Sequence, residues 1–222
     1  MKLAKPLRKI VAGDPLRVSR FHDESGKFCG FLASLGLIPS AFSAIAARVR
    51  GRWLELPWWV WSAIRFTGRQ VQQSDTVIEL GSGYSSLWLA RKCSLVVSVE
   101  QSALWIKALE SMGATSLRRG RLKIVKGEAR TGFMEALGVL RHPDVVVIDS
   151  DSRQEILREL LRRSELPKVI VYDDTDKSEN RGAQELAAPH GYLPHVFRGF
   201  KPQCLHVCET TVFVKSNHSS RH

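Results

Sequence analysis

The chain has 222 residues, 44% of them hydrophobic and 25% charged, as is typical of one soluble globular domain. Its net charge of +11 leaves three kinds of partner open: nucleic acid, an anionic membrane surface and acidic substrates. The basic start, MKLAKPLRKIVAG, has no long apolar region behind it, and the four cysteines form no paired pattern. These features argue against a secretory signal and a disulfide framework, so we expect a cytoplasmic protein with reduced thiols.

Residues 1–56 are predicted to form an N-terminal helical cap or extension. Within them, Phe28–Ala47 carries no charge and approaches the length of a membrane span, although it contains proline, glycine and serine. A helical cap packed on the core is the first interpretation. An interfacial helix is the second, because three arginines follow the apolar run: Arg48, Arg50 and Arg52. On this second interpretation, residues 28–52 make peripheral contact with a membrane.

A tryptophan-rich segment opens the predicted core domain, which spans residues 57–215. Pro57 suits the first turn of a helix, and Trp58, Trp61 and Ile64 recur at helical spacing. We expect this aromatic face to pack in the core. The alternative is that one of the tryptophans lines a substrate pocket.

The rest of the chain is organised around residues 76–100. This stretch predicts a strand, a glycine loop, a helix, a second strand and an acid, at Thr76–Leu80, Gly81–Gly83, Tyr84–Lys92, Leu95–Val99 and Glu100. The glycines allow a sharp turn and the close approach of a ligand. An acid at the tip of the second strand can accept two hydrogen bonds from a ribose diol. We interpret the unit as a binding site for a nucleoside cofactor.

The later segments alternate between predicted helices and strands and end in two consecutive strands. The helices are expected at Gln101–Met112, Thr131–Leu140, Glu155–Arg163 and Ser178–Ala188. The strands are expected at Leu122–Val125, Val145–Ile148, Lys168–Tyr172, Tyr192–Phe197 and Glu209–Lys215. A loop with Gly and Pro, Arg198–Pro202, precedes the last strand. Residues 216–222 are polar and are predicted to be a flexible tail.

Acidic residues lie at the ends of several predicted strands. Asp149 follows one uninterrupted apolar run, and Asp173 and Asp174 end the next. The carboxyl ends of neighbouring parallel strands meet at one edge of a sheet. Asp149 and Asp173 are therefore predicted to emerge side by side, at the edge where Glu79 and Glu100 also lie.

Cys204, His206 and Cys208 alternate along what is predicted to be one strand face. A metal site at these residues would lack a fourth ligand and the usual ligand spacing. We expect a structural role for them, with metal binding as the alternative.

The run Glu79-Leu80-Gly81-Ser82-Gly83-Tyr84-Ser85 resembles motif I, E-x-G-x-G-x-S, of the class I S-adenosylmethionine (SAM) methyltransferases. The resemblance covers roughly residues 57–215. It implies an α/β fold with a Rossmann-like sheet of seven strands, the last antiparallel, and helices on both faces. It also implies a set of SAM-binding residues: Glu79, Gly81, Ser82, Gly83, Tyr84, Ser85, Glu100, Gln101, Glu128, Ala129 and Asp149. Glu128 would accept a hydrogen bond from the adenine amine; as the alternative, it is only a turn acid.

The stretches I-D-S-D-S-R and Y-D-D-T resemble the metal-dependent O-methyltransferases of the catechol and macrolide-sugar types. This resemblance implies a Mg²⁺ ion held by Asp149, Asp173 and Asp174. A cation would explain three converging carboxylates, which otherwise raise one another's pKa. The alternative is that Lys or Arg holds Asp173. Asp149 and Lys177 are the candidate catalytic residues, and two histidines are further candidates for the base: His190 and His195.

The sequence therefore predicts a SAM-dependent methyltransferase acting on a hydroxyl of a small sugar, diol or phenol, with Mg²⁺ assistance. Three alternatives stay open. The net charge favours an RNA or DNA methyltransferase, but no Asn/Asp-Pro-Pro-aromatic motif is present. The apolar N-terminal run favours a membrane-associated or non-catalytic protein with the same fold. The glycine loop alone would also fit an NAD-dependent enzyme. The sequence predicts no oligomeric state.

Overall fold

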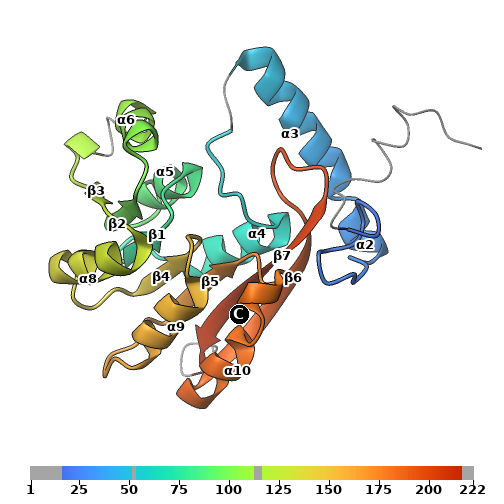
Figure 1. The fold of residues 1–222 in the computed structure, drawn as a ribbon. Helices are drawn as coiled ribbons and strands as arrows, with labels where there is room; N and C mark the ends of the chain where they lie inside the picture. The colour runs from blue at the N-terminus through green and yellow to red at the C-terminus, as the bar shows by residue number, and fades with distance from the viewer. Residues whose placement is uncertain (1–16, 52–53, 113–116, 217–222) are drawn as a thin grey trace, which may run out of the picture.

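The structure, a computed structural model, describes residues 17–51, 54–112 and 117–216. Its centre is a seven-stranded sheet in the order β3-β2-β1-β4-β5-β7-β6 (Figure 1). All neighbouring strands are parallel except β7, which runs antiparallel to β5 and β6. The strands are β1 (Thr76–Leu80), β2 (Leu95–Glu100), β3 (Leu122–Lys126), β4 (Val145–Ile148), β5 (Val169–Asp173), β6 (Tyr192–Phe200) and β7 (Val207–Lys215). The predicted sheet of seven strands is confirmed.

Helices cover both faces of the sheet. Helices α4, α5 and α6 pack on one face, at Trp61–Gln70, Tyr84–Ala90 and Ala103–Met112. Helices α8, α9 and α10 pack on the other, at Ala129–Val139, Arg153–Leu161 and Ala183–Ala187. Alternate residues of β4 enter the two cores, since Val145 and Val147 face the first helices while Val146 and Ile148 face the second. An uninterrupted apolar strand is what such double burial requires.

Several predicted boundaries differ from the observed ones. The strand predicted at Tyr192–Phe197 continues to Phe200 through part of the expected loop, because Arg198 pairs with Glu209 across the hairpin by backbone register and by a side-chain ion pair. The helix predicted at Ser178–Ala188 is interrupted at Gly182, which has a φ of +89°, and consists of η1 (Ser178–Asn180), α10 and η2 (Ala188–His190).

The aromatic face predicted from Pro57 onward is only partly correct. Helix α4 begins at Trp61 rather than in the segment before it, and the fully buried tryptophan is Trp59. Trp58 is 51% exposed and lines a cavity described below. The alternative interpretation, a tryptophan in a pocket wall, therefore agrees with the structure.

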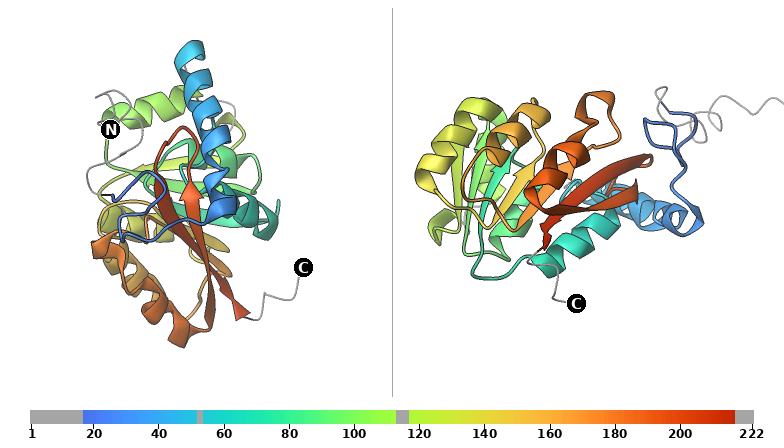
Figure 2. Two further views of the ribbon diagram at one scale, coloured as in Figure 1. Left: turned by 90° about the vertical axis from the view of Figure 1, so that its right-hand side faces the viewer. Right: turned by 90° about the horizontal axis from the view of Figure 1, so that it is seen from below.

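The N-terminal segment is helical, as predicted, and it contacts the domain along one side only. Helices α2 (Phe31–Ser34) and α3 (Leu37–Arg50) lie beside the hairpin of β6 and β7, and α3 extends beyond the sheet (Figure 2). Within α3 the buried residues are two serines, Ser40 and Ser43, whereas the large apolar side chains face outward. The helix therefore docks on the domain through its polar face. Residues 1–16, Arg52 and residues 217–222 of the predicted tail lie outside the described residues.

Candidate active site

Two adjoining cavities open where β1, β2 and β4 end. The first cavity, about 310 Å³, is lined partly by Gln101, Gly127, Ala129 and Lys177. The second, about 500 Å³, is lined by the glycine loop with Trp58 and Trp105. Both cavities are also lined by Gly81, Glu100 and Asp149, so they adjoin one another at these three residues. Volumes of this size suit a small ligand or cofactor.

Most of the predicted cofactor residues line this space. They are Gly81, Ser82, Gly83, Tyr84, Ser85, Glu100, Gln101, Ala129 and Asp149. Glu128 does not: its side chain is exposed, and it is the residue that precedes α8. Its alternative role as a turn acid is therefore favoured.

Gly81 directly follows β1 and packs against the backbone of Asp149, which directly follows the neighbouring strand β4. Its φ is +90°, and a Cβ added to it would lie 2.1 Å from the backbone oxygen of Asp149. The backbone is held there on two sides, since Gly81 N–H donates to Val99 O at 3.1 Å and Asp149 N–H donates to Leu80 O at 2.9 Å. Glycine alone satisfies both the left-handed backbone and the close approach.

Glu79 lies beneath the glycine loop and is completely buried, so it does not line the cavities. Ser86 and Ser98 donate to its Oε2, and Ser86 Oγ in turn accepts from Gly83 N–H at 2.9 Å. Burial raises the pKa of Glu79 to about 7 against these hydrogen bonds. Glu79 therefore positions the loop through Ser86 rather than contacting a ligand, which corrects the predicted direct contact.

Glu100 and Trp105 form the opposite wall. Glu100 Oε1 accepts from Ser102 N–H at 2.8 Å, which leaves its second carboxylate oxygen for a ligand. Trp105 Nε1–H donates to Ser82 O at 2.7 Å and so fixes the loop from the side of α6. Trp105 lies in the helix predicted at Gln101–Met112, and no sequence signal connected it with residue 82.

The three aspartates predicted to converge do so. Asp149, Asp173 and Asp174 each offer an oxygen within 4.8 Å of the others. A lysine that the sequence analysis missed, Lys201, lies among them: its Nζ is 2.6 Å from Asp173 Oδ2 and 2.6 Å from Asp174 Oδ1. Lys201 follows β6 directly and is 28 residues from Asp173 along the chain, so only the antiparallel hairpin brings them together.

Basic and hydroxyl groups occupy the remaining carboxylate oxygens. Thr210 Oγ1 donates to Asp173 Oδ1 at 2.6 Å, and Lys177 Nζ lies 2.7 Å from Asp174 Oδ2. Arg153 Nη2 donates to Asp149 Oδ1 at 2.9 Å. Every oxygen of Asp173 and Asp174 thus has a partner. The alternative that a lysine holds Asp173 agrees with the structure.

This donor set does not fit a divalent cation. Metal ligands must present free oxygens to the ion, whereas an ammonium group occupies the centre of this cluster. Burial lowers the pKa of Lys201, but Asp173 and the other acids beside it raise it more, so the pKa lies well above its ordinary value and the lysine stays charged. Lys201, Arg153 and Lys177 together balance the three carboxylates.

The candidate bases differ in their surroundings. Burial raises the pKa of Asp149, although Arg153 opposes the shift. Burial lowers the pKa of Lys177, but its contact with Asp174 raises it above the ordinary value overall, so the amine stays protonated. His195 stacks on Phe66 with ring centroids 4.5 Å apart, and neither His190 nor His195 lines the two cavities. Of these groups, Asp149 is best placed to accept a proton.

Known proteins match this chain in structure and not in sequence. No protein-family model matches the sequence, and no curated protein matches it. A precorrin-6Y C5,15-methyltransferase from Geobacter metallireducens superposes with a TM-score of 0.57 at 20% identity, over 69% of this chain and 87% of that one. An O-methyltransferase from Bacillus cereus, solved with SAH, gives 0.53 at 19% identity, over 82% and 91%. The chain has the class I methyltransferase fold.

A third structure supports the same assignment of the fold. An O-methyltransferase from Streptomyces achromogenes involved in tomaymycin synthesis, solved with SAM, gives a TM-score of 0.50 at 18% identity, over 80% of this chain and 89% of that one. The structural superpositions establish the methyltransferase fold. At sequence identities this low, the substrate and the chemistry have to be inferred from the residues of this chain.

The residues of this methyltransferase fold suit SAM. Gly81 lines both cavities and packs against the backbone of Asp149, and the acid at the end of β2, Glu100, lies at the same wall. The loop over residues 81–85 would hold the methionine part, Glu100 the ribose hydroxyls, and Gln101 and Ala129 the adenine. The sequence missed Trp105 and Lys201, which come from segments without a motif.

Proposed function

We propose that the chain is a SAM-dependent methyltransferase that transfers a methyl group to a hydroxyl of a small molecule. The observation that carries this proposal is the pair of adjoining cavities at Gly81, which most of the predicted cofactor residues line. The methyltransferase fold and its neighbours solved with SAM and SAH support it. An RNA or DNA methyltransferase is the alternative that the positive charge favours.

The reaction requires alignment and the removal of one proton. SAM, when bound, supplies an electrophilic methyl group on a sulfonium. The chain itself would orient the acceptor beside the aromatic walls that Trp58 and Trp105 give to the second cavity. Asp149 lies where the two cavities meet, and its raised pKa makes it a stronger base than a solvated aspartate. The hydroxyl proton would pass to Asp149 Oδ2, since Oδ1 accepts from Arg153.

A third cavity, about 530 Å³, is the proposed acceptor site. It is lined by Trp58, Lys177 and Lys201 among others, and Trp58 and Lys177 also line the second and first cavities respectively. The protonated amines of the two lysines would attract an acceptor that carries hydroxyl or acidic groups. Since Lys201 balances the aspartates, we propose that Mg²⁺ is not needed for this step.

Glu100→Ala is expected to weaken SAM binding about 10- to 100-fold, because hydrogen bonds to a charged group contribute roughly 1.5–3 kcal/mol. Isothermal titration with SAM measures this change, and micromolar affinity is expected for the wild type. The matched control is Glu110→Ala, an exposed acid on α6 outside the cavities. Equal affinity in all three proteins would contradict the assignment of Glu100 to the ribose.

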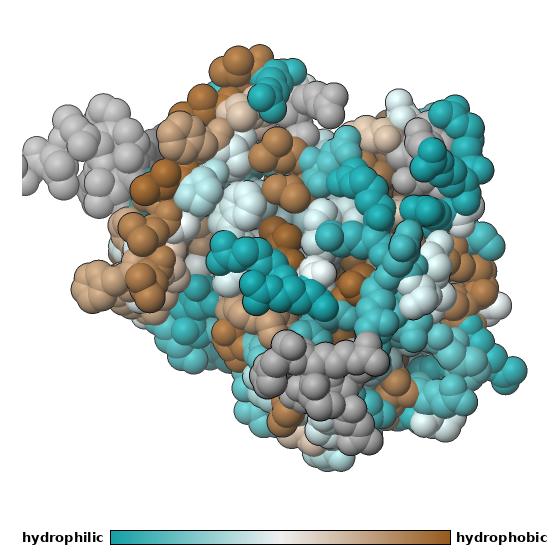
Figure 3. Space-filling model, turned by 180° about the vertical axis from the view of Figure 1, so that it is seen from behind, coloured by the Kyte–Doolittle hydropathy of each residue, from teal (hydrophilic) through white to brown (hydrophobic). Residues whose placement is uncertain are grey.

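A second proposal concerns the N-terminal helices: we propose that α2 and α3 bind an anionic membrane surface. The exposed apolar side chains form one stripe, because their spacing of three and four residues returns each to the same side of the helix: Phe31, Leu35, Ile38, Phe42, Ile45 and Val49. Figure 3 shows hydrophobic residues gathered along this edge of the molecule. Phe31 is 87% exposed and Val49 is 80% exposed.

The opposite side of α3 is polar and docks on the domain. Ser40 Oγ donates to Lys201 O at 2.8 Å and accepts from Trp61 Nε1–H, and Ser43 Oγ accepts from Gln203 N–H at 2.7 Å. Phe31–Arg50 is long and apolar enough to cross a membrane by length and composition, with a mean hydropathy of 1.5. Its docked serine face instead favours a helix that lies in the interface.

The charge around the stripe favours anionic lipid. Between Glu24 and Glu55 the sequence carries no acidic residue and four basic ones: Lys27, Arg48, Arg50 and Arg52. Basic residues beside an apolar stripe add electrostatic attraction to its hydrophobic burial.

Flotation with vesicles tests this second proposal. The wild type is expected to float with phosphatidylglycerol vesicles and weakly with pure phosphatidylcholine. The double variant Phe42→Asp/Ile45→Asp should lose binding at least about 10-fold, because burying each side chain contributes roughly 2 kcal/mol. Leu104→Asp, an exposed leucine on α6, is the control. The proposal fails if the double variant floats like the control. It also fails if the two substitutions alter the oligomeric state of the protein and leave its binding to vesicles unchanged.

A further inference from the structure

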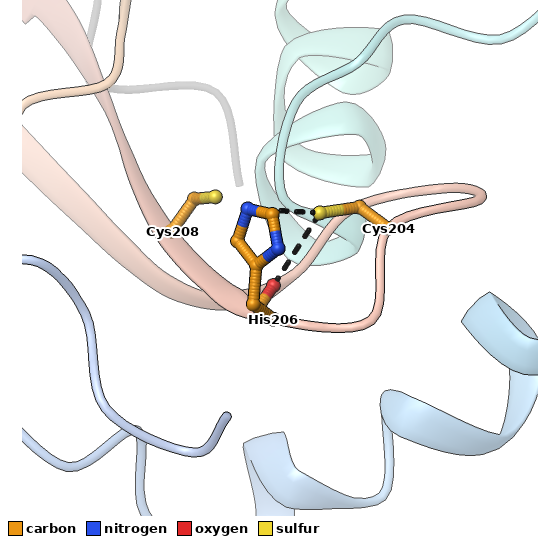
Figure 4. A group of neighbouring side chains, drawn as sticks. All are labelled: Cys204, His206 and Cys208. Carbon is orange, nitrogen blue, oxygen red and sulfur yellow. Dashed lines mark hydrogen bonds between the residues drawn. The ribbon is translucent and has the colours of Figure 1, made fainter. Parts of the chain in front are cut away.

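Cys204, His206 and Cys208 form a cluster outside the proposed SAM site. Cys204 and His206 lie in the turn between β6 and β7, and only Cys208 lies within β7. The predicted alternation along one strand face is therefore wrong for the first two. The turn nevertheless brings one Sγ, one imidazole nitrogen and the second Sγ within 4.8 Å of one another. In Figure 4 the imidazole of His206 lies between the two sulfur atoms, which point toward it from opposite sides.

The separations suit a tetrahedral metal ion. Zinc binds thiolate sulfur at about 2.3 Å and imidazole nitrogen at about 2.0–2.1 Å, which places a sulfur and a nitrogen ligand roughly 3.5 Å apart. Cys204 Sγ and His206 Nε2 are 3.3 Å apart. Two cysteines and one histidine are also the soft donor set that zinc prefers over Mg²⁺.

We propose that Cys204, His206 and Cys208 bind one zinc ion with its fourth coordination position open to the third cavity. All three residues line this cavity together with Lys177 and Lys201. The fourth ligand is water or a donor atom of the molecule bound there. Three protein ligands and one open position are the arrangement of zinc sites that meet a ligand rather than of closed structural sites.

The surrounding charge supports this assignment. Arg17 Nη2 lies 4.0 Å from Cys208 Sγ, and the ammonium group of Lys201 is also close enough to interact with this thiol. Two thiolates, one neutral imidazole and Zn²⁺ sum to zero charge, so the ion adds no net charge to an already basic region.

The site would also fix the lysine of the acid cluster. Cys204 N–H donates to Lys201 O at 3.2 Å, and Ser40 of α3 donates to the same oxygen. A metal at Cys204 would therefore hold the turn that positions Lys201. This zinc site does not depend on the proposed methyl transfer, and its test does not use activity.

Metal analysis of the full, reduced chain tests the proposal. We expect one zinc per chain, and on replacement by Co²⁺ a thiolate-to-cobalt charge-transfer absorption. Cys204→Ser and Cys208→Ser should each weaken zinc binding by more than about 100-fold, since even residues that only support a metal ligand typically contribute 10- to 100-fold. Two variants outside the cluster are the controls. Cys29→Ser removes the thiol just before α2, and His190→Ala removes a histidine of η2.

Two results would overturn the zinc site. One is a cobalt spectrum of the wild type without a thiolate band, which needs no variant to fold. The other is a reduced protein that binds no zinc and instead forms a disulfide between Cys204 and Cys208 on mild oxidation. Circular dichroism of each variant separates a lost ligand from a lost fold.

Discussion

Gly81→Ala is expected to abolish SAM binding and to destabilise the folded chain by about 3 kcal/mol or more. The added Cβ would lie 2.1 Å from Asp149 O, a backbone atom held in place by the strand pairing of β1 with β4. The φ of +90° adds strain for any residue with a Cβ. Urea denaturation measures the loss of stability, and isothermal titration measures the loss of SAM binding.

Substitutions at two other glycines serve as controls for Gly81→Ala. Gly138 in α8 has nothing within 4 Å of an added Cβ, so Gly138→Ala should stabilise the helix by roughly 0.5–1 kcal/mol. Gly83 has an extended backbone and lines the second cavity, and an added Cβ would meet Ser85 Oγ at 3.5 Å and Ser85 N at 3.9 Å, which are ordinary contacts. Gly83→Ala should therefore fold normally and still bind SAM less tightly. A Gly81→Ala protein as stable as the Gly138 variant would refute the close approach.

Lys201→Met is expected to destabilise the chain by about 3–5 kcal/mol, the usual cost of removing one partner from a buried ion pair. Asp173 is almost fully buried, and without Lys201 its Oδ2 would lose its only charged donor. Lys177→Met is the matched control. Lys177 contacts Asp174 alone among the acids and its side chain is 32% exposed, so its loss should cost less than about 1 kcal/mol.

Divalent cations give a second measurement on the same cluster. If Lys201 takes the place of a metal, Mg²⁺ and Mn²⁺ should leave the melting temperature of the wild type unchanged. Lys201→Ala removes the ammonium group and leaves three converging carboxylates, so millimolar Mn²⁺ should raise its melting temperature by several degrees, as any ligand of the folded state does. A wild type that Mg²⁺ stabilises would instead restore the predicted metal site.

The parts of the fold that were predicted correctly are those encoded by residues that are neighbours along the chain. The strands of the parallel sheet were predicted because a strand buried on both faces needs an unbroken apolar run, as in Val145–Ile148. The convergence of Asp149 and Asp173 followed from the rule that parallel strands end at one edge. The final hairpin was predicted with the wrong boundaries, since its pairing through Arg198 and Glu209 depends on a contact between two strands.

The sequence by itself determined the sheet, the glycine loop and the acidic strand ends, because each is encoded by neighbouring residues. Only the tertiary structure decided what those groups do. It placed Lys201 among the aspartates, buried Glu79 beneath the loop and turned the serine face of α3 inward. These outcomes depend on which distant side chains become neighbours. Charge balance and burial are properties of that neighbourhood, so no local pattern in the chain could specify them.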